Sequence, residues 1–266
     1  MTGEGAMPTY IVDAFTDHRG GGNPAAVIEL GSPVSEEWMR LTASDLGLPA
    51  TVFVQQAGDG PAGPSLRWFT GPRELPSCGH GTLAAAHVAL GRDQGLASIA
   101  YATRLGRLTA TRRGDWIELL MPAQQLEDWQ LPEWAVEALG ATPVAVVRSE
   151  QHVLVAVAEE ATVRGLDPDL AALARLPTVG LAVTAPGSGG YDVVSRWFVP
   201  SERFEDQATG TAHCLIGPYW AARGLPRLRA WQASRRGGEL RVSAGEDGVR
   251  IAGQAVTSLH GHLRSA

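Results

Sequence analysis

Two short polar segments stand directly before apolar helical stretches, and both carry residue types suited to binding or proton chemistry. They are Cys78-Gly79-His80-Gly81-Thr82 and Asp206-Gln207-Ala208-Thr209-Gly210-Thr211. Glycine lets a backbone approach a ligand closely, and the first turn of a helix leaves backbone N–H groups unpaired. Such a helix end carries partial positive charge that favours an anion. Ordinary capping would explain either segment alone, but the two together predict a clamp that holds an anionic or carbanionic substrate between two helix N-termini.

An internal repeat relates the two segments. Arg67-Trp68-Phe69 recurs as Arg196-Trp197-Phe198, 129 residues later, and the same ungapped shift places Gly81-Thr82 on Gly210-Thr211. A repeat of about half the chain length predicts two similar lobes. We therefore expect each copy to form a strand, a turn and a helix that begins with small residues.

The surrounding pattern predicts many short strands and few helices. Strands are indicated where β-branched or aromatic runs lie between Gly, Pro or Asp residues. Strand-rich halves with one central helix each favour an α+β fold over a doubly wound parallel sheet. The predicted helices are 36–45, 82–91, 134–139, 167–176 and 211–223. The predicted lobes span 7–122 and 123–258, the C-terminal strand can cross back to the first lobe, and 1–6 and 259–266 are predicted to be flexible.

Composition excludes several classes of function. All 22 basic residues are arginine, so no lysine is available for a Schiff base with pyridoxal phosphate or a substrate carbonyl. The net charge of −6 and the absence of a basic run argue against nucleic-acid binding. No apolar run approaches the roughly 20 residues of a membrane span. Two cysteines are too few for a disulfide framework, so a cytoplasmic protein is expected. Because the sequence has no lysine, no nucleotide-binding loop and no convincing metal-ligand cluster, we expect no metal or other cofactor.

The motifs resemble those of the phenazine-biosynthesis PhzF-like family, and the resemblance covers nearly the whole chain. The matching stretches, in order, are Val12–Thr16, Gly22–Val27, Leu66–Thr70, Cys78–Ala86, Glu205–His213 and Arg236–Leu240. The resemblance implies the diaminopimelate epimerase-like fold, in which each of two pseudo-symmetric lobes is a curved, mostly antiparallel sheet wrapped around a central helix. It also implies a homodimer that acts on a small molecule.

The resemblance assigns roles to particular residues. His80, Asp206 and Thr211 correspond to the family's histidine, aspartate and small hydroxyl residue, with threonine here where serine is usual. His80 and Asp206 are thereby predicted to be catalytic. The substrate-binding residues are predicted to be Cys78, Gly79, Gly81, Thr82, Thr209, Gly210, Thr211 and Ala50.

Ala50 marks the main departure from the family. The proton-shuttling glutamate lies in a Ser-Glu-Thr-x-Phe-Val pattern, and here that stretch reads Pro49-Ala50-Thr51-Val52-Phe53-Val54. A positioned acid or base contributes about 10²–10⁴ in rate. Three outcomes are open: proton transfer has moved to another group, the reaction has changed to one such as a cyclisation, or activity is lost. The candidates for the new group are His80, Asp206, Cys78 and Glu74. His80 is best placed, because the ordinary pKa of histidine near 6.5 suits transfer in both directions.

These observations predict a cofactor-independent isomerase-like or cyclase-like enzyme of secondary metabolism that acts on a carboxylate-bearing metabolite. An amino-acid epimerase or racemase is the alternative enzyme. An inactive homologue that binds a metabolite or a partner is the alternative outside catalysis. Racemases of this superfold use one thiol in each lobe, but the repeat shift carries Cys78 to Gln207, which disfavours a two-thiol mechanism. Cys78 can equally be a small buried apolar residue.

Overall fold

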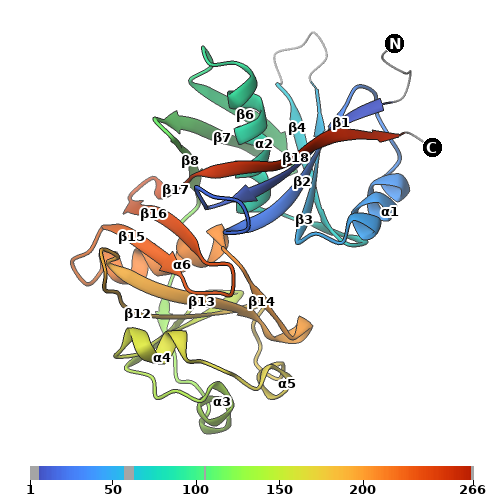
Figure 1. Ribbon diagram of the computed structural model, residues 1–266. Helices are drawn as coiled ribbons and strands as arrows, with labels where there is room; N and C mark the ends of the chain where they lie inside the picture. Colours follow the sequence, from blue (N-terminus) through green and yellow to red (C-terminus); the bar gives the residue numbers. More distant parts are fainter. Residues whose placement is uncertain (1–5, 57–62, 105, 265–266) are drawn as a thin grey trace. The chain divides into compact units, whose positions relative to one another are not determined.

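The computed structural model describes residues 6–56, 63–104 and 106–264. It divides the chain into two compact units, unit 1 (Met1–Leu120 with Ala252–Ala266) and unit 2 (Met121–Ile251). Each unit is a sheet-dominated α+β structure (Figure 1), which confirms the predicted fold class. Residues 1–5 and 265–266, part of the termini predicted to be flexible, lie outside the described residues.

Unit 1 is built on a mixed sheet. Its order is β18–β1–β2–β3–β4–β6–β7–β8, with β5 hydrogen-bonded to β4; β2–β3 and β4–β6 are parallel and the other pairs are antiparallel. The elements are β1 (Ala6–Ala14), β2 (Asn23–Leu30), α1 (Glu36–Leu46), β3 (Ala50–Gln55), β4 (Ser65–Thr70), β5 (Arg73–Leu75), α2 (Gly79–Arg92), β6 (Ser98–Thr103), β7 (Gly106–Arg113), β8 (Trp116–Met121) and β18 (Ala255–Arg264).

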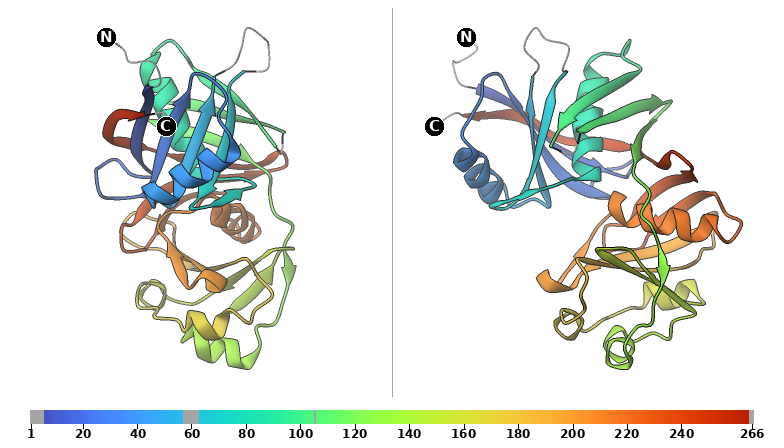
Figure 2. Two further views of the ribbon diagram at one scale, coloured as in Figure 1. Left: turned by 90° about the vertical axis from the view of Figure 1, so that its right-hand side faces the viewer. Right: turned by 180° about the vertical axis from the view of Figure 1, so that it is seen from behind.

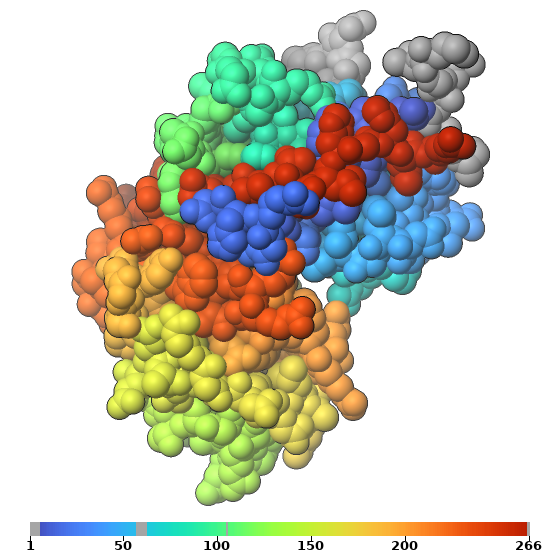
Figure 3. Space-filling view, in the orientation of Figure 1, coloured from blue at the N-terminus to red at the C-terminus, as the bar shows by residue number. Residues whose placement is uncertain are grey.

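The last strand corrects the prediction for the C-terminus. Residues 259–264, predicted to be flexible, belong to β18, which pairs with β1 along its whole length. Ala6, also predicted to be flexible, is the first residue of β1 and pairs with Arg264. The pairing satisfies the backbone hydrogen-bonding groups that a free tail would leave to water. Figure 3 shows β18, in red, running across the visible face of unit 1. Alternating side chains of β18 remain exposed, including Leu259.

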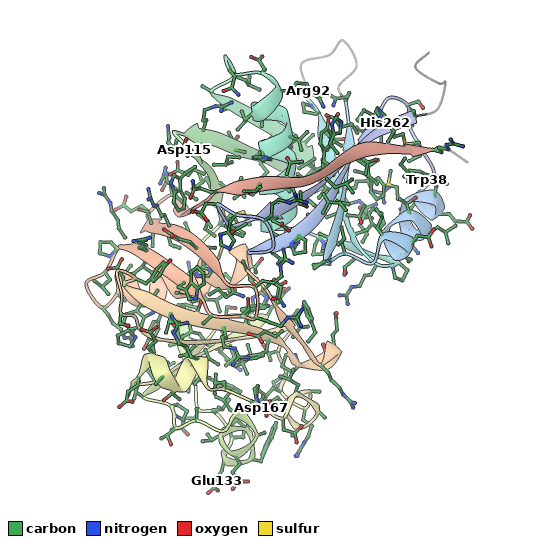
Figure 4. All side chains as sticks on the ribbon, viewed as in Figure 1. Trp38, Arg92, Asp115, Glu133, Asp167 and His262 are labelled. Atoms are coloured by element: carbon green, nitrogen blue, oxygen red, sulfur yellow. The ribbon has the colours of Figure 1, made fainter. Side chains whose placement is uncertain are left out.

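Helices cover both faces of the unit 1 sheet. Ten of the 14 residues of α2 are buried, and the helix contacts β1, β2, β3, β6, β7 and β18 (Figure 2). On the other face, α1 packs Met39 and Ala43 against Phe53. Trp38, labelled in Figure 4, meets the edge of Phe53 with ring centroids 5.8 Å apart. Strand alternation therefore decides what each residue of β3 touches, because successive side chains point to opposite faces.

Unit 2 repeats these strand pairings. Its order is β9–β10–β11–β12–β13–β15–β16, with β14 hydrogen-bonded to β13; β11–β12 and β13–β15 are parallel and the other pairs are antiparallel. The elements are β9 (Glu127–Asp128), α3 (Glu133–Leu139), β10 (Ala145–Arg148), β11 (His152–Ala156), α4 (Glu160–Arg164), α5 (Leu170–Leu173), β12 (Gly180–Pro186), β13 (Val193–Val199), β14 (Phe204–Asp206), α6 (Gly210–Ala221), β15 (Arg227–Gln232), β16 (Gly238–Gly245) and β17 (Gly248–Gly253).

The two buried helices α2 and α6 thus follow corresponding hairpins, β4–β5 and β13–β14. One core cluster of unit 2 lies between its sheet and α3, α4 and α5, and includes Leu139, Val155, Leu173 and Phe198. Each such buried apolar side chain contributes roughly 1.5–3 kcal/mol to stability. Within the described ranges, no helix is long and apolar enough to cross a membrane.

Candidate functional site

The start of α2 places Cys78 and His80 together in unit 1. Cys78 is the N-cap residue, in extended conformation, and its Sγ accepts a hydrogen bond from the Gly81 N–H at 3.4 Å. The Thr82 hydroxyl donates to the Cys78 carbonyl at 2.8 Å. His80 Nδ1 lies 3.5 Å from Cys78 Sγ, and both side chains are buried. A thiol and an imidazole at this separation can share a proton, as in cysteine-based active sites.

The position of Gly81 leaves no room for a side chain. A Cβ on Gly81 would lie 2.8 Å from Val52 Cγ2, 3.0 Å from Cys78 Sγ and 3.1 Å from Trp68 Cδ1. These distances are shorter than ordinary van der Waals contact. The helix therefore starts in close contact with β3 and β4, with the thiol at the point of contact.

Ala50 lies on the same face of β3 as Val52, because the two are separated by one residue. Val52 lies next to Gly81 of α2, so the face that carries Ala50 is the one that α2 covers. The Ala50 side chain is fully buried. A methyl group neither gives nor takes a proton, so β3 supplies no acid or base at this position.

The start of α6 places Asp206 and Thr209 together in unit 2. Asp206 ends β14 and pairs with Trp197 of β13. The Thr209 hydroxyl donates to Asp206 Oδ2 at 2.5 Å. Thr209 occupies the N-cap position of α6 but makes no side-chain capping bond, because its hydroxyl is turned to the carboxylate. Gly210 is buried and Thr211 is half-buried in the first turn.

Gln232 and His213 surround Thr209. Gln232, at the end of β15, accepts from the Thr209 N–H at 2.8 Å and donates to the Asp206 carbonyl at 2.8 Å and to Thr209 Oγ1 at 3.1 Å. His213 Nδ1 is 2.8 Å from the Thr209 carbonyl. Complete burial lowers the pKa of His213 to about 4, outweighing the opposite effect of that hydrogen bond, so the ring is neutral at pH 7.

Matching ion pairs brace the two hairpins. Arg67 forms a two-pronged bond with Glu74, and Arg196 forms one with Glu205, at 2.6–2.8 Å. Each arginine also stacks on the phenylalanine two residues later, Phe69 or Phe198, at 5.2 and 5.0 Å from the ring centroid. Both arginines of the repeat are therefore paired with glutamate side chains of their own hairpins, which supports a structural role.

The hairpins also correct the repeat register. Phe69 pairs with Glu74, whereas Phe198 pairs with Glu205, so the second hairpin is two residues longer. Beyond the hairpin the equivalent residues are 131 apart: Glu74 with Glu205, and the N-caps Cys78 with Thr209. The shift of 129 that carried Cys78 to Gln207 holds only for the first strand of each hairpin. Position for position, the thiol corresponds to a hydroxyl.

The structure therefore gathers the predicted residues into one group in each unit. Cys78, Gly79, His80, Gly81 and Thr82 lie together at α2, and Asp206, Thr209, Gly210 and Thr211 lie together at α6.

Gln232 is the residue that the sequence analysis missed. A signal was present, because Leu228, Ala230 and Gln232 alternate on the buried face of β15, where an amide is out of place unless it is hydrogen-bonded. Among the described residues, no cluster of three His, Cys, Asp or Glu side chains could hold a metal ion.

The chain is similar in sequence and in structure to known proteins. The family model described as phenazine biosynthesis-like protein matches residues 12–261. A curated protein of Halalkalibacterium halodurans, named an uncharacterized isomerase, is 40% identical over 96% of this chain and 98% of its own. The crystal structure of a PhzF-family phenazine biosynthesis protein from Enterococcus faecalis superposes with a TM-score of 0.91 at 33% identity, covering 98% of this chain and 100% of that one.

A more distant structure shares the fold alone. It is a hydroxyproline epimerase of Agrobacterium vitis, with a TM-score of 0.63 at 14% identity, covering 99% of this chain and 94% of that one. The diaminopimelate epimerase-like architecture thus extends from near relatives to enzymes with little sequence in common.

Proposed function

This chain belongs to the phenazine biosynthesis-like family, and we propose that it is an isomerase that moves a proton within a small carboxylate-bearing metabolite. Three curated relatives at 40% identity are named isomerases. The observation that carries the proposal is the buried Asp206 at the start of α6, held by the hydroxyl of Thr209. A buried carboxylate in a fixed orientation is suited to accept a proton or to orient the group that loses one.

In this proposal His80 is the second proton-transfer group. Its imidazole is buried beside Cys78 at the start of α2, and an imidazole works in both directions near neutral pH. Cys78, Gly79, Gly81, Thr82, Thr209, Gly210, Thr211 and Ala50 contact the substrate. The backbone N–H groups of a helix start favour a carboxylate by about 0.3–1 kcal/mol, and more where water is excluded.

The proposal includes no cofactor. The chain has no lysine for a Schiff base, and the described residues contain no metal-binding cluster. A cytoplasmic location, a role in secondary metabolism and a homodimeric state complete the proposal. The location is inferred from the low cysteine count, and the other two rest on the family resemblance.

Cyclisation is the second candidate reaction, and Ala50 favours it. The position that carries a proton-shuttling glutamate in the family has no ionisable group in this chain. A cyclisation that depends on orientation and electrostatic activation requires no strong base at that position.

Deuterium incorporation separates these reactions. The purified protein is incubated in D2O with a panel of small amino, hydroxy and unsaturated acids, and proton NMR follows each C–H signal. An isomerase or epimerase replaces a substrate hydrogen by deuterium at the carbon that changes. A product that contains a new ring and carries no deuterium on carbon supports the cyclase, whereas an isomer without deuterium shows that the substrate's own hydrogen was transferred directly. If no acid in a broad panel reacts but some bind, the chain is a metabolite-binding homologue and the enzyme proposal is wrong.

Ala50→Glu tests whether the chemistry has moved away from β3. We expect no gain in kcat on the substrate identified in D2O, because the new carboxylate would enter a fully buried position that now holds a methyl group. Ala50→Gln, of equal size but uncharged, is the matched control for the steric effect. A large gain in kcat for the glutamate variant alone would show that the protein is an isomerase lacking only its usual base.

A further inference from the structure

We propose that Gln232 is a positioning residue that sets the direction of a hydrogen-bond chain ending on Asp206. This inference rests on the proposed function, in which Asp206 acts on the substrate. Gln232 is fully buried, and its strand partners are Gly238 on β16 and Ser195 on β13. Its amide makes the three hydrogen bonds to Thr209 and Asp206 described above, so both ends of the amide are used.

The backbone decides which way the amide faces. The Thr209 N–H can only donate, so the atom of Gln232 that faces it is the oxygen. The Asp206 carbonyl can only accept, so the atom that faces it is the nitrogen. Two backbone groups of fixed polarity thus select a single orientation of the side chain.

That orientation determines where the Thr209 hydroxyl hydrogen points. Gln232 Nε2 donates to Thr209 Oγ1, so this oxygen is the acceptor in that bond. The hydroxyl hydrogen is then directed to Asp206 Oδ2, 2.5 Å away. The chain runs in one sense, from amide to hydroxyl to carboxylate, and it holds Oδ2 as an acceptor.

Thr209 is held on every polar atom. Its N–H is bound to Gln232, its carbonyl accepts from His213 Nδ1, and its hydroxyl lies between Gln232 and Asp206. The hydroxyl is consequently not available to cap α6. The sequence therefore uses an N-cap threonine to orient a carboxylate instead of to close a helix.

The same β15–β16 hairpin supplies a matched control. Ser234 donates to the Gln207 carbonyl at 2.6 Å, so it ties the hairpin to the same loop without touching Thr209 or Asp206. Ser234→Ala removes this bond and the one that Ser234 Oγ accepts from the Gly237 N–H, and it leaves the proposed chain intact. Gln232→Met keeps the side-chain length but removes both ends of the amide.

The first measurement requires no substrate. Hydrogen–deuterium exchange of the Thr209 amide, followed by NMR, should accelerate by about tenfold in Gln232→Met and stay within about twofold of wild type in Ser234→Ala. The exchange rate reports only on the hydrogen bond between the Thr209 N–H and Gln232. This result therefore stands whether or not the proposed isomerase activity is found. Unchanged exchange at Thr209 in a folded Gln232→Met protein would overturn the inference.

The second measurement uses the substrate identified in D2O. We expect Gln232→Met to lower kcat by about 10²-fold with little change in KM, because a carboxylate displaced by about 1 Å loses this much rate. Ser234→Ala should retain kcat within about threefold. If wild type turns over and Gln232→Met matches it, the inference fails while the proposed function stands.

Gln232→Glu tests the direction of the hydrogen-bond chain, because it replaces the donor end of the amide by a carboxylate oxygen. It also provides a second variant if the Gln232→Met protein does not fold. The ionised glutamate can accept from Thr209 but cannot donate to Asp206 or to the hydroxyl, whereas the protonated form can donate once. The ratio of its kcat to that of wild type should therefore rise as the pH falls.

Asp206 on β14 and His213 on α6 are the ionisable groups nearest this position, and both are present in wild type as well, so the ratio isolates residue 232. A ratio that does not change with pH would show that Gln232 has a merely structural role.

Discussion

The turns that precede α2 and α6 occupy corresponding places in the two units but carry different chemistry. In unit 1 the N-cap side chain is a thiol that accepts from its helix and lies beside an imidazole. In unit 2 the N-cap side chain is a hydroxyl that makes no capping hydrogen bond to its helix and donates to a carboxylate instead. The strand pairings and the braced hairpins are the same in both.

The two units therefore share their strand pairings and hairpins, but they differ in the side chains at the start of the buried helix. A hairpin held by an arginine–glutamate pair delivers the chain to a buried helix in either unit, and whatever residue arrives at the N-cap faces the first turn. Two residues added to the second hairpin leave the bonded Arg196–Glu205 pair in place. The groups at the helix starts therefore differ although the strands and hairpins that lead to them correspond.

The largest expected effect tests whether both turns take part in catalysis. His80→Ala and Asp206→Ala should each lower turnover of the substrate identified in D2O by about 10²-fold or more, the lower end for loss of an acid or base. His87→Ala, a half-buried histidine on the same helix α2, is the control and should stay within about threefold of wild type. A loss confined to one of the two variants would show that only that unit is catalytic.

The second prediction concerns acid stability, which should differ between the units. Burial lowers the pKa of His213 and of His152 in unit 2 to about 4, whereas in unit 1 it lowers the pKa of His87 by less. The unfolded chain takes up these protons near pH 6.5 while the folded unit does not, so stability is complete above pH 6.5 and is lost as the pH falls toward 4. For fully buried His213 the loss approaches roughly 3 kcal/mol of unfolding free energy.

Hydrogen exchange resolved by segment is the measurement. Between pH 7.5 and 5, the strands of unit 2 should lose more protection than those of unit 1. His213→Asn, which keeps a donor for the Thr209 carbonyl but does not titrate, should flatten the change in unit 2. Equal loss of protection in both units, or no flattening in the variant, would contradict the prediction.

The smallest expected effect compares the two bracing arginines. Arg196→Met should destabilise the protein by about 2–3 kcal/mol, because Arg196 also donates to the carbonyls of Leu166 and Val163 and its loss leaves Glu205 unpaired. Arg67→Met should cost only about 1 kcal/mol, since Arg104 Nη1 still pairs with Glu74 at 2.7 Å. Denaturant midpoints measure both. A larger loss for Arg67→Met would reverse the ranking.

Local pattern was sufficient for much of the fold. The recurring Arg-Trp-Phe strand, the apolar run after Thr82 and the β-branched strands predicted two α+β units, because periodicity and propensity act over a few residues. Helix starts were less accurate. The start of α2 was predicted at residue 82 but lies at Gly79, since glycines are poor helix formers and Cys78 was not recognised as a cap. The helix predicted at 167–176 is only Leu170–Leu173, capped by Asp169 after Pro168.

The sequence by itself determined which groups stand at the two helix starts: a thiol and an imidazole at one, a carboxylate and a hydroxyl at the other. Only the tertiary structure decided which of them correspond, because cross-strand register depends on hairpin length and not on the ungapped spacing of motifs. It alone brought Gln232 against Asp206, 26 residues earlier in the chain. The direction of that hydrogen-bond chain follows from backbone donors and acceptors that meet only after β14, β15 and α6 have packed together.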